Sequence, residues 1–355
     1  MPNSNTHFSN LLILWYIDHK RELPWRQTKD PYAIWLSEII LQQTKVAQGL
    51  PYYKVFISTF PTVHDLANAP EEKVLKLWQG LGYYSRARNL HFTSKYISKD
   101  LNGVFPINYT ELLKLKGVGD YTASAIASIC YNEAAAVVDG NVYRVLARFF
   151  GISTPINSSL GIKEFKSLAQ QLIDPSQSGT YNQAIMEFGA RHCKPNKPDC
   201  TSCIFNDKCV ALQKNLVAEL PVKLKKTVVK KWYFNYFIIQ SEGGNIILQQ
   251  RTKKGIWQQL YEFPLIETDK EIELNQLIQL EDYKELSKTH SISTITLYNE
   301  KSIIHKLSHR HLHTRFWLVE TDNNSVMEIP LASITKYPVP ALIENFITSY
   351  FGLKV

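Results

Sequence analysis

Two carboxylates occupy sequence positions where they could act as a catalytic pair. Glu38 lies in an apolar stretch, WLSEIIL. If that side of the segment faces a pocket, desolvation would raise the pKa of Glu38 and make it a general acid near neutral pH. On a solvent-facing side it would be an ordinary surface glutamate. Asp139 precedes a helix predicted over residues 141–150, so it would be the N-cap by default, and the helix N-terminus would keep it anionic. An acid and a buried anion together suit cleavage of a glycosidic bond through an oxocarbenium-like transition state.

Four of the five cysteines are clustered with an unusual spacing. Cys193, Cys200, Cys203 and Cys209 are separated by six, two and five residues, which is not the distribution of a disulfide framework. The spacing predicts four thiolate ligands of one metal centre. A structural zinc site is the alternative to an iron-sulfur cluster, although zinc modules usually pair their cysteines in two short halves. The fifth cysteine, Cys130, is expected to be part of the core.

A glycine turn, Gly117-Val118-Gly119, lies between two apolar segments with helical spacing. This pattern predicts a helix-hairpin-helix over about residues 112–130. The glycines can adopt positive φ, and they let the N–H groups that begin the second helix face an anion such as a DNA phosphate. An ordinary helical hairpin with a glycine cap is the alternative reading. A second glycine-rich loop, residues 80–88, carries aromatic side chains and two arginines, so Tyr83 could stack on bases or wedge between them.

Helices are expected to position these groups. The patterns predict helices over residues 8–20 and 31–50, two more within 60–106, and a helical stretch over 163–192 that leads into the cysteine loop. Leu41 and Gln42 follow Glu38 by three and four residues, so both are expected on its face. Residues 216–231 combine proline with many lysines and predict a linker. From Trp232 onward the pattern alternates with period two, and a helix is expected near the end, which predicts a smaller α+β domain.

The charge and length of the chain narrow the class of protein. The 355 residues suggest two domains, and the net charge of +8 is uneven, with 25 basic and 18 acidic side chains in residues 1–225 against 15 and 14 in the remainder. Any polyanion is therefore expected to bind the first part. No signal peptide or membrane span is expected, and a thiolate cluster favours a reducing compartment, so we expect a cytoplasmic, nucleoid-associated protein.

Together the motifs resemble one enzyme family. The segments WLSEIILQQT, GLGYYSRARNL, LKGVGDYTASAI and VVDGNVYRVLARF, followed by the four-cysteine loop, are similar in sequence and order to the adenine DNA glycosylase (MutY) family of the endonuclease III superfamily. The resemblance is close over residues 8–220. It implies an all-α helix-hairpin-helix glycosylase domain (1–215) with a 4Fe-4S cluster loop (193–209), a linker (216–231), and an α+β Nudix-like domain (232–355). We therefore expect a monomeric DNA repair hydrolase that acts on double-stranded DNA.

The resemblance also implies roles for individual residues. The reaction would be removal of adenine mispaired with 8-oxoguanine or guanine, with the adenine flipped out of the duplex. Glu38 would protonate the adenine ring and Asp139 would stabilise the oxocarbenium ion. The remaining residues expected at the adenine pocket or around the flipped nucleotide are Arg26, Gln42, Gln43, Thr44, Leu81, Tyr83, Tyr121, Asn141 and Gln183.

The C-terminal part departs from the family pattern in two ways. Residues 265–288 contain no arginine and no REx2EE pattern, so pyrophosphate hydrolysis is not expected. The family reads the oxidised guanine with a Phe-Ser-His loop, and here that loop is Leu307-Ser308-His309. The alternative for this region is a metal site, because His309, His311 and His313 recur at every second residue.

Two other functions compete with base removal alone. A glycosylase that is also a lyase would need a lysine amine as nucleophile. The related lyases carry it as GVGxK, whereas this chain has Tyr121 at that position. A non-catalytic DNA-binding module would not need Glu38 and Asp139 in their motifs.

Overall fold

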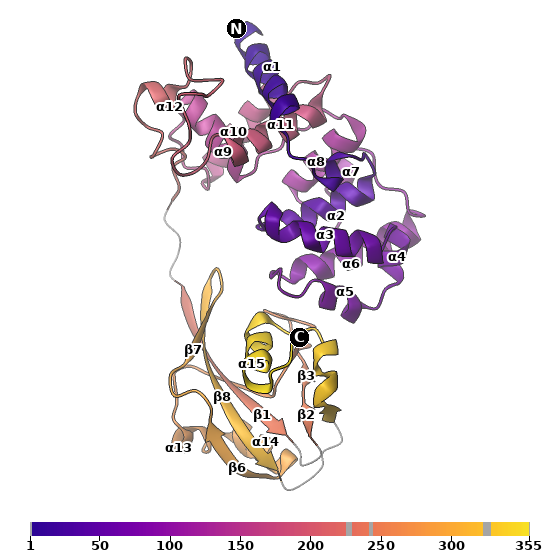
Figure 1. Ribbon diagram of the computed structural model, residues 1–355, viewed down its shortest axis with the longest axis vertical. Coiled ribbons are helices and arrows are strands. Elements are labelled where there is room, and N and C mark those ends of the chain that lie inside the picture. The colour runs from indigo at the N-terminus through magenta and orange to yellow at the C-terminus, as the bar shows by residue number, and fades with distance from the viewer. Residues whose placement is uncertain (1, 225–228, 241–243, 322–327, 355) are drawn as a thin grey trace. The chain divides into compact units, whose positions relative to one another are not determined.

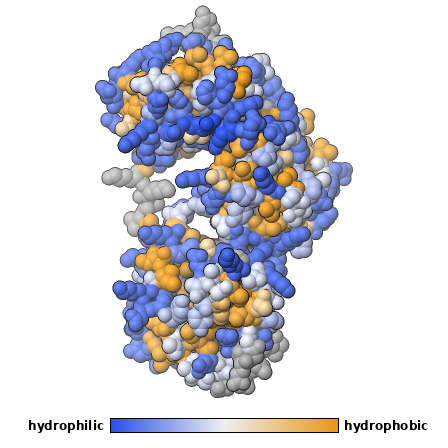
Figure 2. Space-filling view, in the orientation of Figure 1, coloured by the Kyte–Doolittle hydropathy of each residue, from blue (hydrophilic) through white to orange (hydrophobic). Residues whose placement is uncertain are grey.

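The computed structural model describes residues 2–224, 229–240, 244–321 and 328–354 and divides the chain into two compact units (Figure 1). The first consists of Met1–Asn68 and Asn89–Lys225, and the second of Ala69–Arg88 and Lys226–Val355. Of the predicted linker, residues 225–228 lie outside the described residues. Within the part of the chain that is described, no helix is long and apolar enough to cross a membrane. The face shown in Figure 2 is mostly hydrophilic, with apolar side chains in smaller patches.

Every regular element of the first unit is helical. A 3-10 turn, Pro24–Arg26, joins α1 to α2, and α6 continues into this unit from the second one. The helices are α1 (Pro2–His19), α2 (Pro31–Leu41), α3 (Val46–Thr59), α4 (Val63–Asn68), α6 (Ser85–Asp100), α7 (Tyr109–Leu112), α8 (Asp120–Tyr131), α9 (Gly140–Phe150), α10 (Ser159–Leu172), α11 (Ser178–Arg191) and α12 (Val210–Gln213).

Local sequence explains where the helices that carry the site begin and end. Helix α2 starts at Pro31, and the Asp30 side chain caps it by accepting hydrogen bonds from the N–H groups of Tyr32 and Ala33. It ends at Leu41, much earlier than the predicted residue 50. Helix α9 ends at Phe150 and is capped by Gly151, which adopts φ +70°. A core formed by α1, α8, α9, α10 and α11 includes the buried side of α9, and α2 packs against α8.

The predicted helix-hairpin-helix is present, but its first helix is only the four-residue α7. Leu113 and Leu115, which continue the apolar pattern of that helix in the sequence, lie in the turn that follows it. Val118 in the turn is buried, and this anchors the hairpin. Gly117 adopts φ +82°, and a Cβ atom there would lie 2.7 Å from the Cβ atom of Asn89. Gly117 is therefore required by both conformation and space.

The second unit contains a mixed sheet with the order β6-β8-β1-β2-β9, in which β5 also pairs with β1 and β7 with β8. Its long central strands pair in parallel from Lys230↔Arg310 to Gln240↔Glu320. The strands are β1 (Lys230–Gln240), β2 (Asn245–Ile247), β3 (Gln249–Gln250), β4 (Tyr261–Glu262), β5 (Leu265–Thr268), β6 (Ile292–Leu297), β7 (Ile303–Lys306), β8 (Arg310–Thr321) and β9 (Glu328–Pro330).

Alternating side chains of β1 and β8 pack on helices at both faces of this sheet. Phe237 on one face packs against Tyr283 of α14 (Glu281–His290). Phe316 on the other face stacks on Phe346 of α15 (Ala341–Phe351), with ring centroids 4.2 Å apart. The smaller α13 (Leu274–Leu277) and the 3-10 helix Leu331–Lys336 complete the C-terminal part. The prediction of an α+β fold for the C-terminal part is confirmed.

Helix α5 (Glu71–Leu77) and the loop after it belong to the second unit. The Gln79 side chain accepts a hydrogen bond from the N–H of Val339, and the Tyr84 hydroxyl donates to the carbonyl of the same residue. Arg88 donates to the carbonyl of Gln258 at 2.8 Å. Residues 69–88 are thus tied to a part of the chain that is distant in sequence.

Candidate active site

The first unit contains a cleft of about 780 Å³, counted out to its open mouth. Seven predicted site residues line it, and they come from four helices and the loops beside them. These seven are Arg26, Glu38, Thr44, Tyr121, Asp139, Asn141 and Gln183. The structure therefore gathers most of the predicted site, although its members are spread over more than 150 positions of sequence.

Glu38 is buried on α2, with 7% of its surface exposed. Burial raises its pKa to about 7, and the nearby anion Asp139 adds to this rise. A hydrogen bond with Tyr121 and the charge of Arg26 act in the opposite direction. Glu38 therefore faces a pocket rather than solvent, and near neutral pH much of it carries a proton that it can donate.

Tyr121 stands at the start of α8 and faces the cleft. Burial and the neighbouring carboxylates Glu38 and Asp139 raise its pKa well above the ordinary value. The phenol is therefore neutral throughout the physiological range and can serve as a hydrogen-bond donor. Its hydroxyl also lies 3.1 Å from the sulfur atom of Met186 on α11.

Asp139 caps α9 as predicted. Its Oδ1 atom accepts hydrogen bonds of 2.8 Å from the N–H groups of Asn141 and Val142. Burial has the largest effect on the pKa of Asp139 and raises it above the usual aspartate value. These hydrogen bonds and the charge of Arg144 act in the opposite direction and favour the carboxylate. The anion is thus partly desolvated, which strengthens its attraction for a nearby cation.

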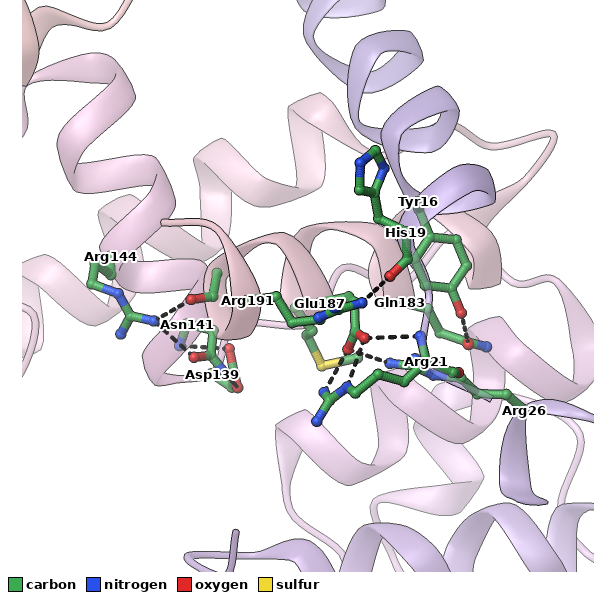
Figure 3. A network of polar contacts seen from close by, with 12 residues as sticks. Tyr16, His19, Arg21, Arg26, Asp139, Asn141, Arg144, Gln183, Glu187 and Arg191 are labelled. Carbon is green, nitrogen blue, oxygen red and sulfur yellow. Dashed lines mark hydrogen bonds and ion pairs between the residues drawn. The ribbon is translucent and has the colours of Figure 1, made fainter. Parts of the chain in front are cut away.

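Asn141 and Arg144 connect Asp139 to the cysteine loop, and Figure 3 shows the part of this connection between Asp139, Asn141 and Arg144. Asn141 donates to Asp139, and its own Oδ1 atom accepts from Arg144 at 2.9 Å. The buried Arg144 also donates to the carbonyl of Cys193 at 2.8 Å. A continuous chain of hydrogen bonds therefore runs from the pocket carboxylate to the backbone of the first cysteine.

Glu187 was not predicted, yet it is the most fully buried carboxylate of the cleft, with 0% exposure. Arg21 and Arg26 both pair with it, at 2.6 and 2.7 Å (Figure 3). Burial opposes ionisation, but hydrogen bonds and charges from the two arginines outweigh it and lower the pKa of Glu187 to about 2. The signal was present in the sequence, since Glu187 interrupts the apolar segment AIMEFGA much as Glu38 interrupts WLSEIIL.

Gln183, one helical turn before Glu187, is held in the cleft by the hydroxyl of Tyr16, which donates to its Oε1 atom at 2.6 Å. This hydrogen bond orients the side-chain amide so that the Nε2 group of Gln183 can donate. Arg26 lies 5.4 Å from the centroid of the Tyr16 ring. One wall of the cleft is therefore an ordered set of hydrogen-bonding groups.

Two glutamines do not line the cleft. Gln42 was expected on the same helical face as Glu38, but α2 ends at Leu41, so its side chain turns away and donates to the hydroxyl of Thr122 at 3.2 Å. Leu41 does line the cleft, as expected. Gln43 is exposed and adopts φ +57°, an uncommon conformation for a non-glycine residue.

The other predicted nucleotide-contacting residues belong to the second unit. Tyr83 is 46% exposed and adopts φ +48°, whereas Leu81 is buried, with 6% exposure. Ser308 and His309 form the exposed tip between β7 and β8. The hydroxyls of Tyr83 and Ser308 lie 2.5 Å apart. The residues expected to read bases thus occur as a pair in this unit.

The hairpin has the features of an anion-binding turn. Within the described chain, no side chain caps the N-terminus of α8, where Gly119 is the N-cap. A Cβ atom added at Gly119 would meet nothing within 4 Å. The N–H groups of the first turn of α8 therefore face open space that a phosphate could occupy.

The four clustered cysteines line one small cavity together with Arg148 and His192. A single zinc ion needs four sulfurs at about 2.3 Å from one point, and no group of three or more His, Cys, Asp or Glu among the described residues could hold one ion. An iron-sulfur cluster spreads its thiolates over several irons and so needs a wider arrangement. Arg148 and the N–H of Phe205 each lie 3.5 Å from a cysteine sulfur and could donate to thiolates. Four cysteine thiolates are the donor set that such a cluster takes.

Among the described residues no group of three histidines is placed to hold one ion either. The ring of His313 packs on the ring of Tyr233.

Comparisons with known proteins match two parts of the chain to known families. Residues 36–172 match the HhH-GPD superfamily of base excision DNA repair proteins, and residues 235–349 match the NUDIX domain. Over 308 residues the chain is 36% identical to the adenine DNA glycosylase of Buchnera aphidicola subsp. Acyrthosiphon pisum (strain APS). This match covers 86% of this chain and 84% of the Buchnera protein. Over 218 residues it is 44% identical to the adenine DNA glycosylase of Homo sapiens, which covers 59% of this chain and 40% of the human protein.

Solved structures resemble the helical part. A thermostable thymine-DNA glycosylase matches with a TM-score of 0.55 at 30% identity, over 59% of this chain and 97% of that one. Endonuclease III in a non-covalent DNA complex matches with a TM-score of 0.53 at 24% identity, over 61% of this chain and 98% of that one. The second likeness concerns the fold alone.

Proposed function

Because the chain belongs to the adenine DNA glycosylase family, we propose that it removes adenine mispaired with 8-oxoguanine, and with guanine, from double-stranded DNA. The observation that carries the proposal is the pairing in one cleft of a buried, proton-bearing acid, Glu38, with a hydrogen-bonded carboxylate, Asp139. Hydrolysis of the N-glycosyl bond to adenine needs both an acid for the base and an anion for the sugar.

Each step of the chemistry has a residue in the cleft. The adenine is flipped out of the duplex into the cleft. Glu38 gives its proton to a ring nitrogen of the base, which makes the base a better leaving group. Asp139 lowers the energy of the positive charge that develops on the sugar as the bond to adenine breaks. Water then adds to C1′ and loses a proton, for which the carboxylates of Glu38 and Asp139 are the acceptors in the cleft. Tyr121 donates a hydrogen bond to the carboxylate that Glu38 becomes, and this supports proton release.

The wall that contains Glu187 suits recognition of adenine. The exocyclic amine of adenine is a donor and its ring nitrogens are acceptors. Glu187 is ionised and can only accept hydrogen bonds, while the guanidinium of Arg26 and the amide of Gln183 can donate. Glu187 itself is fully buried and its oxygens accept from Arg21 and Arg26, so it orients Arg26 rather than meeting the base.

Several features favour base removal without lyase action. A lyase of this superfamily attacks the sugar with an amine. Among the described residues that line the cleft there is no lysine, and Tyr121 occupies the position after the hairpin where related lyases carry it.

The four-cysteine loop is proposed to hold a 4Fe-4S cluster through Cys193, Cys200, Cys203 and Cys209. Such a cluster, when bound, would organise the loop that carries Lys194, Lys197 and Lys208 and hold it for contact with DNA. Iron analysis of the purified protein should give about four irons per chain with absorption near 400 nm. One zinc per colourless chain would contradict the assignment.

The C-terminal domain is proposed to read the base opposite adenine. Ser308 and His309 at the β7–β8 tip, with Tyr83 beside Ser308, are polar or stacking groups suited to the edge of 8-oxoguanine. Leu81 would have to leave its buried position before it could fill space in the duplex. The proposed protein is a monomer with a glycosylase domain (1–215), a linker (216–231) and a Nudix-like domain (232–355).

The test of the proposed function is a duplex with one adenine opposite 8-oxoguanine, incubated with the protein and then divided with and without hot alkali. Strand cleavage only after alkali is the expected result. Cleavage without alkali would indicate a lyase, and an intact strand in both halves would contradict glycosylase activity. Asp139→Asn, which keeps the size of the side chain and removes its charge, should bind the duplex but release little adenine.

A further inference from the structure

The segment that leads into Asp139 has an unusual backbone. Residues 132–139 form neither helix nor strand, yet Ala135, Ala136 and Val137 are buried, with 9%, 0% and 1% exposure. Buried N–H and C=O groups need hydrogen-bond partners. Since regular structure does not provide them here, other groups must fix the position of this segment and therefore of Asp139.

Side chains of α10 and α11 provide these partners. Asn182 accepts from the N–H of Val137 at 3.1 Å and donates to the carbonyl of Ala135 at 2.8 Å. Gln170 accepts from the N–H of Ala136 at 3.1 Å and donates to the carbonyl of Ala134. The carbonyl of Ala136 accepts from the ammonium group of Lys166 at 2.7 Å.

Lys166 also holds the beginning of α8. Its Nζ atom lies 2.8 Å from a carboxylate oxygen of Asp120 and 3.1 Å from the hydroxyl of the buried Ser124. The Tyr109 hydroxyl donates to Asp120 at 2.7 Å. An ammonium group has three protons, so Asp120, Ser124 and Ala136 together use its full donor capacity. Lys166 is the described side chain whose hydrogen bonds reach both the N-terminus of α8 and the segment before Asp139.

We propose that Lys166 is a positioning residue that couples the DNA-facing end of the hairpin to the placement of Asp139. The inference rests on the proposed function, in which a DNA phosphate lies at the N-terminus of α8. Asp120 is a half-exposed carboxylate at that terminus and would repel the phosphate if it were not paired. Lys166 neutralises this charge and, with the same ammonium group, fixes the peptide three residues before Asp139.

Lys166→Met tests the proposal because it keeps the length of the side chain and removes its charge and protons. Single-turnover excision with saturating enzyme should fall about tenfold, the value expected when a charge-assisted hydrogen bond is lost. DNA affinity should weaken and depend more steeply on salt. The matched control is Lys163→Met on the same helix, since Lys163 is exposed and its replacement removes the same charge while leaving the saturated rate unchanged.

The double variant Lys166→Met/Asp120→Asn separates the two parts of the coupling. It removes the unpaired carboxylate, so DNA affinity should recover while the saturated excision rate stays low. Full recovery of the rate would show that Lys166 acts only by neutralising Asp120 and would overturn the link to Asp139. An unchanged saturated rate in Lys166→Met would overturn it as well.

Amide hydrogen exchange without DNA gives a readout that does not depend on catalysis. In Lys166→Met, peptides that cover residues 132–139 should exchange faster than in the unsubstituted protein, while the core of α11 keeps its protection. Unchanged exchange in this segment would overturn the positioning role. If the unsubstituted protein released no adenine, the proposed function would fail, and the exchange result would still decide whether Lys166 holds the segment.

Discussion

The side-chain amide of Asn141 donates a hydrogen bond of 2.7 Å to the Oδ2 atom of Asp139. Because this hydrogen bond favours the carboxylate, it lowers the pKa of Asp139 against the effect of burial. Asn141→Ala should therefore raise that pKa further, and the acid side of the excision profile should move to higher pH. Single-turnover rates measured across pH would detect the shift. An unmoved acid side would mean that the N–H groups of α9 suffice to keep Asp139 ionised.

The alkaline side of the same profile should be set by Glu38. Its pKa is raised to about 7, so the proton needed by adenine is present below that pH and is lost above it. The excision rate should fall about tenfold for each pH unit above the midpoint. Glu38→Gln should lose about 10²-fold or more of the rate at pH 7, and the residual activity should lack the alkaline fall. A retained midpoint near pH 7 in this variant would assign it to another group.

Glu38 should also make stability depend on pH. Its pKa is higher in the folded protein than in an unfolded chain, where it is near 4.5. The folded state therefore binds more protons between about pH 4.5 and 7, and the free energy of unfolding should decrease as pH rises through this window. Denaturant titrations of Glu38→Gln should show a smaller decrease over the same range.

The Glu187 cluster should contribute strongly to stability. Glu187→Gln leaves Arg21 and Arg26 without their shared anion, and loss of one member of a buried ion pair costs about 3–5 kcal/mol. Glu111→Gln is the matched control, because its pairing with Lys114 is exposed and should be worth less than about 1 kcal/mol. Denaturant unfolding at pH 7 would measure both. Since the pKa of Glu187 is lowered to about 2, its contribution should be present above about pH 4.5 and disappear as pH falls toward 2.

Ser308 and His309 should govern the choice of the opposite base. The double variant Ser308→Ala/His309→Ala should still excise adenine opposite guanine but lose about tenfold of its preference for adenine opposite 8-oxoguanine, the size of one good base-edge contact. Competition between the two duplexes would measure the ratio. An unchanged ratio would move recognition of the oxidised base to residues such as Thr44 or Tyr83.

Much of the helical site could be predicted because its chemistry stands out from its surroundings. A carboxylate in an apolar helix, an aspartate before a helix, a glycine hairpin and four spaced cysteines each carry a local signal. Glu38, Tyr121, Asp139 and Asn141 do meet in one cleft. The orientation of Gln42 could not be predicted, because it depends on α2 ending at Leu41, the residue directly before Gln42.

What escaped prediction depends on contacts between residues that are distant in sequence. Glu187 becomes an ionised pocket group only because Arg21 and Arg26 contact it from the segment between α1 and α2. The raised pKa of Asp139 follows from burial, which is a tertiary property that outweighs the local effect of the N-cap. The side chains that hold residues 132–139 were equally invisible, because lysine, glutamine and asparagine on amphipathic helices are usually solvated.

The grouping of residues 69–88 with the C-terminal part bears on the order in which the protein assembles. Tyr84 can form its hydrogen bond with Val339 only after a further 255 residues have been synthesised. The parallel strands β1 and β8, which pair with each other, begin at residues 230 and 310. Contacts that close such long loops form late and slowly. During synthesis the ribosome therefore releases helix α5 and its loop long before their partners exist. The first unit can begin to form its core while that loop still lacks its later contacts, and the second unit is completed only after helix α15 has emerged.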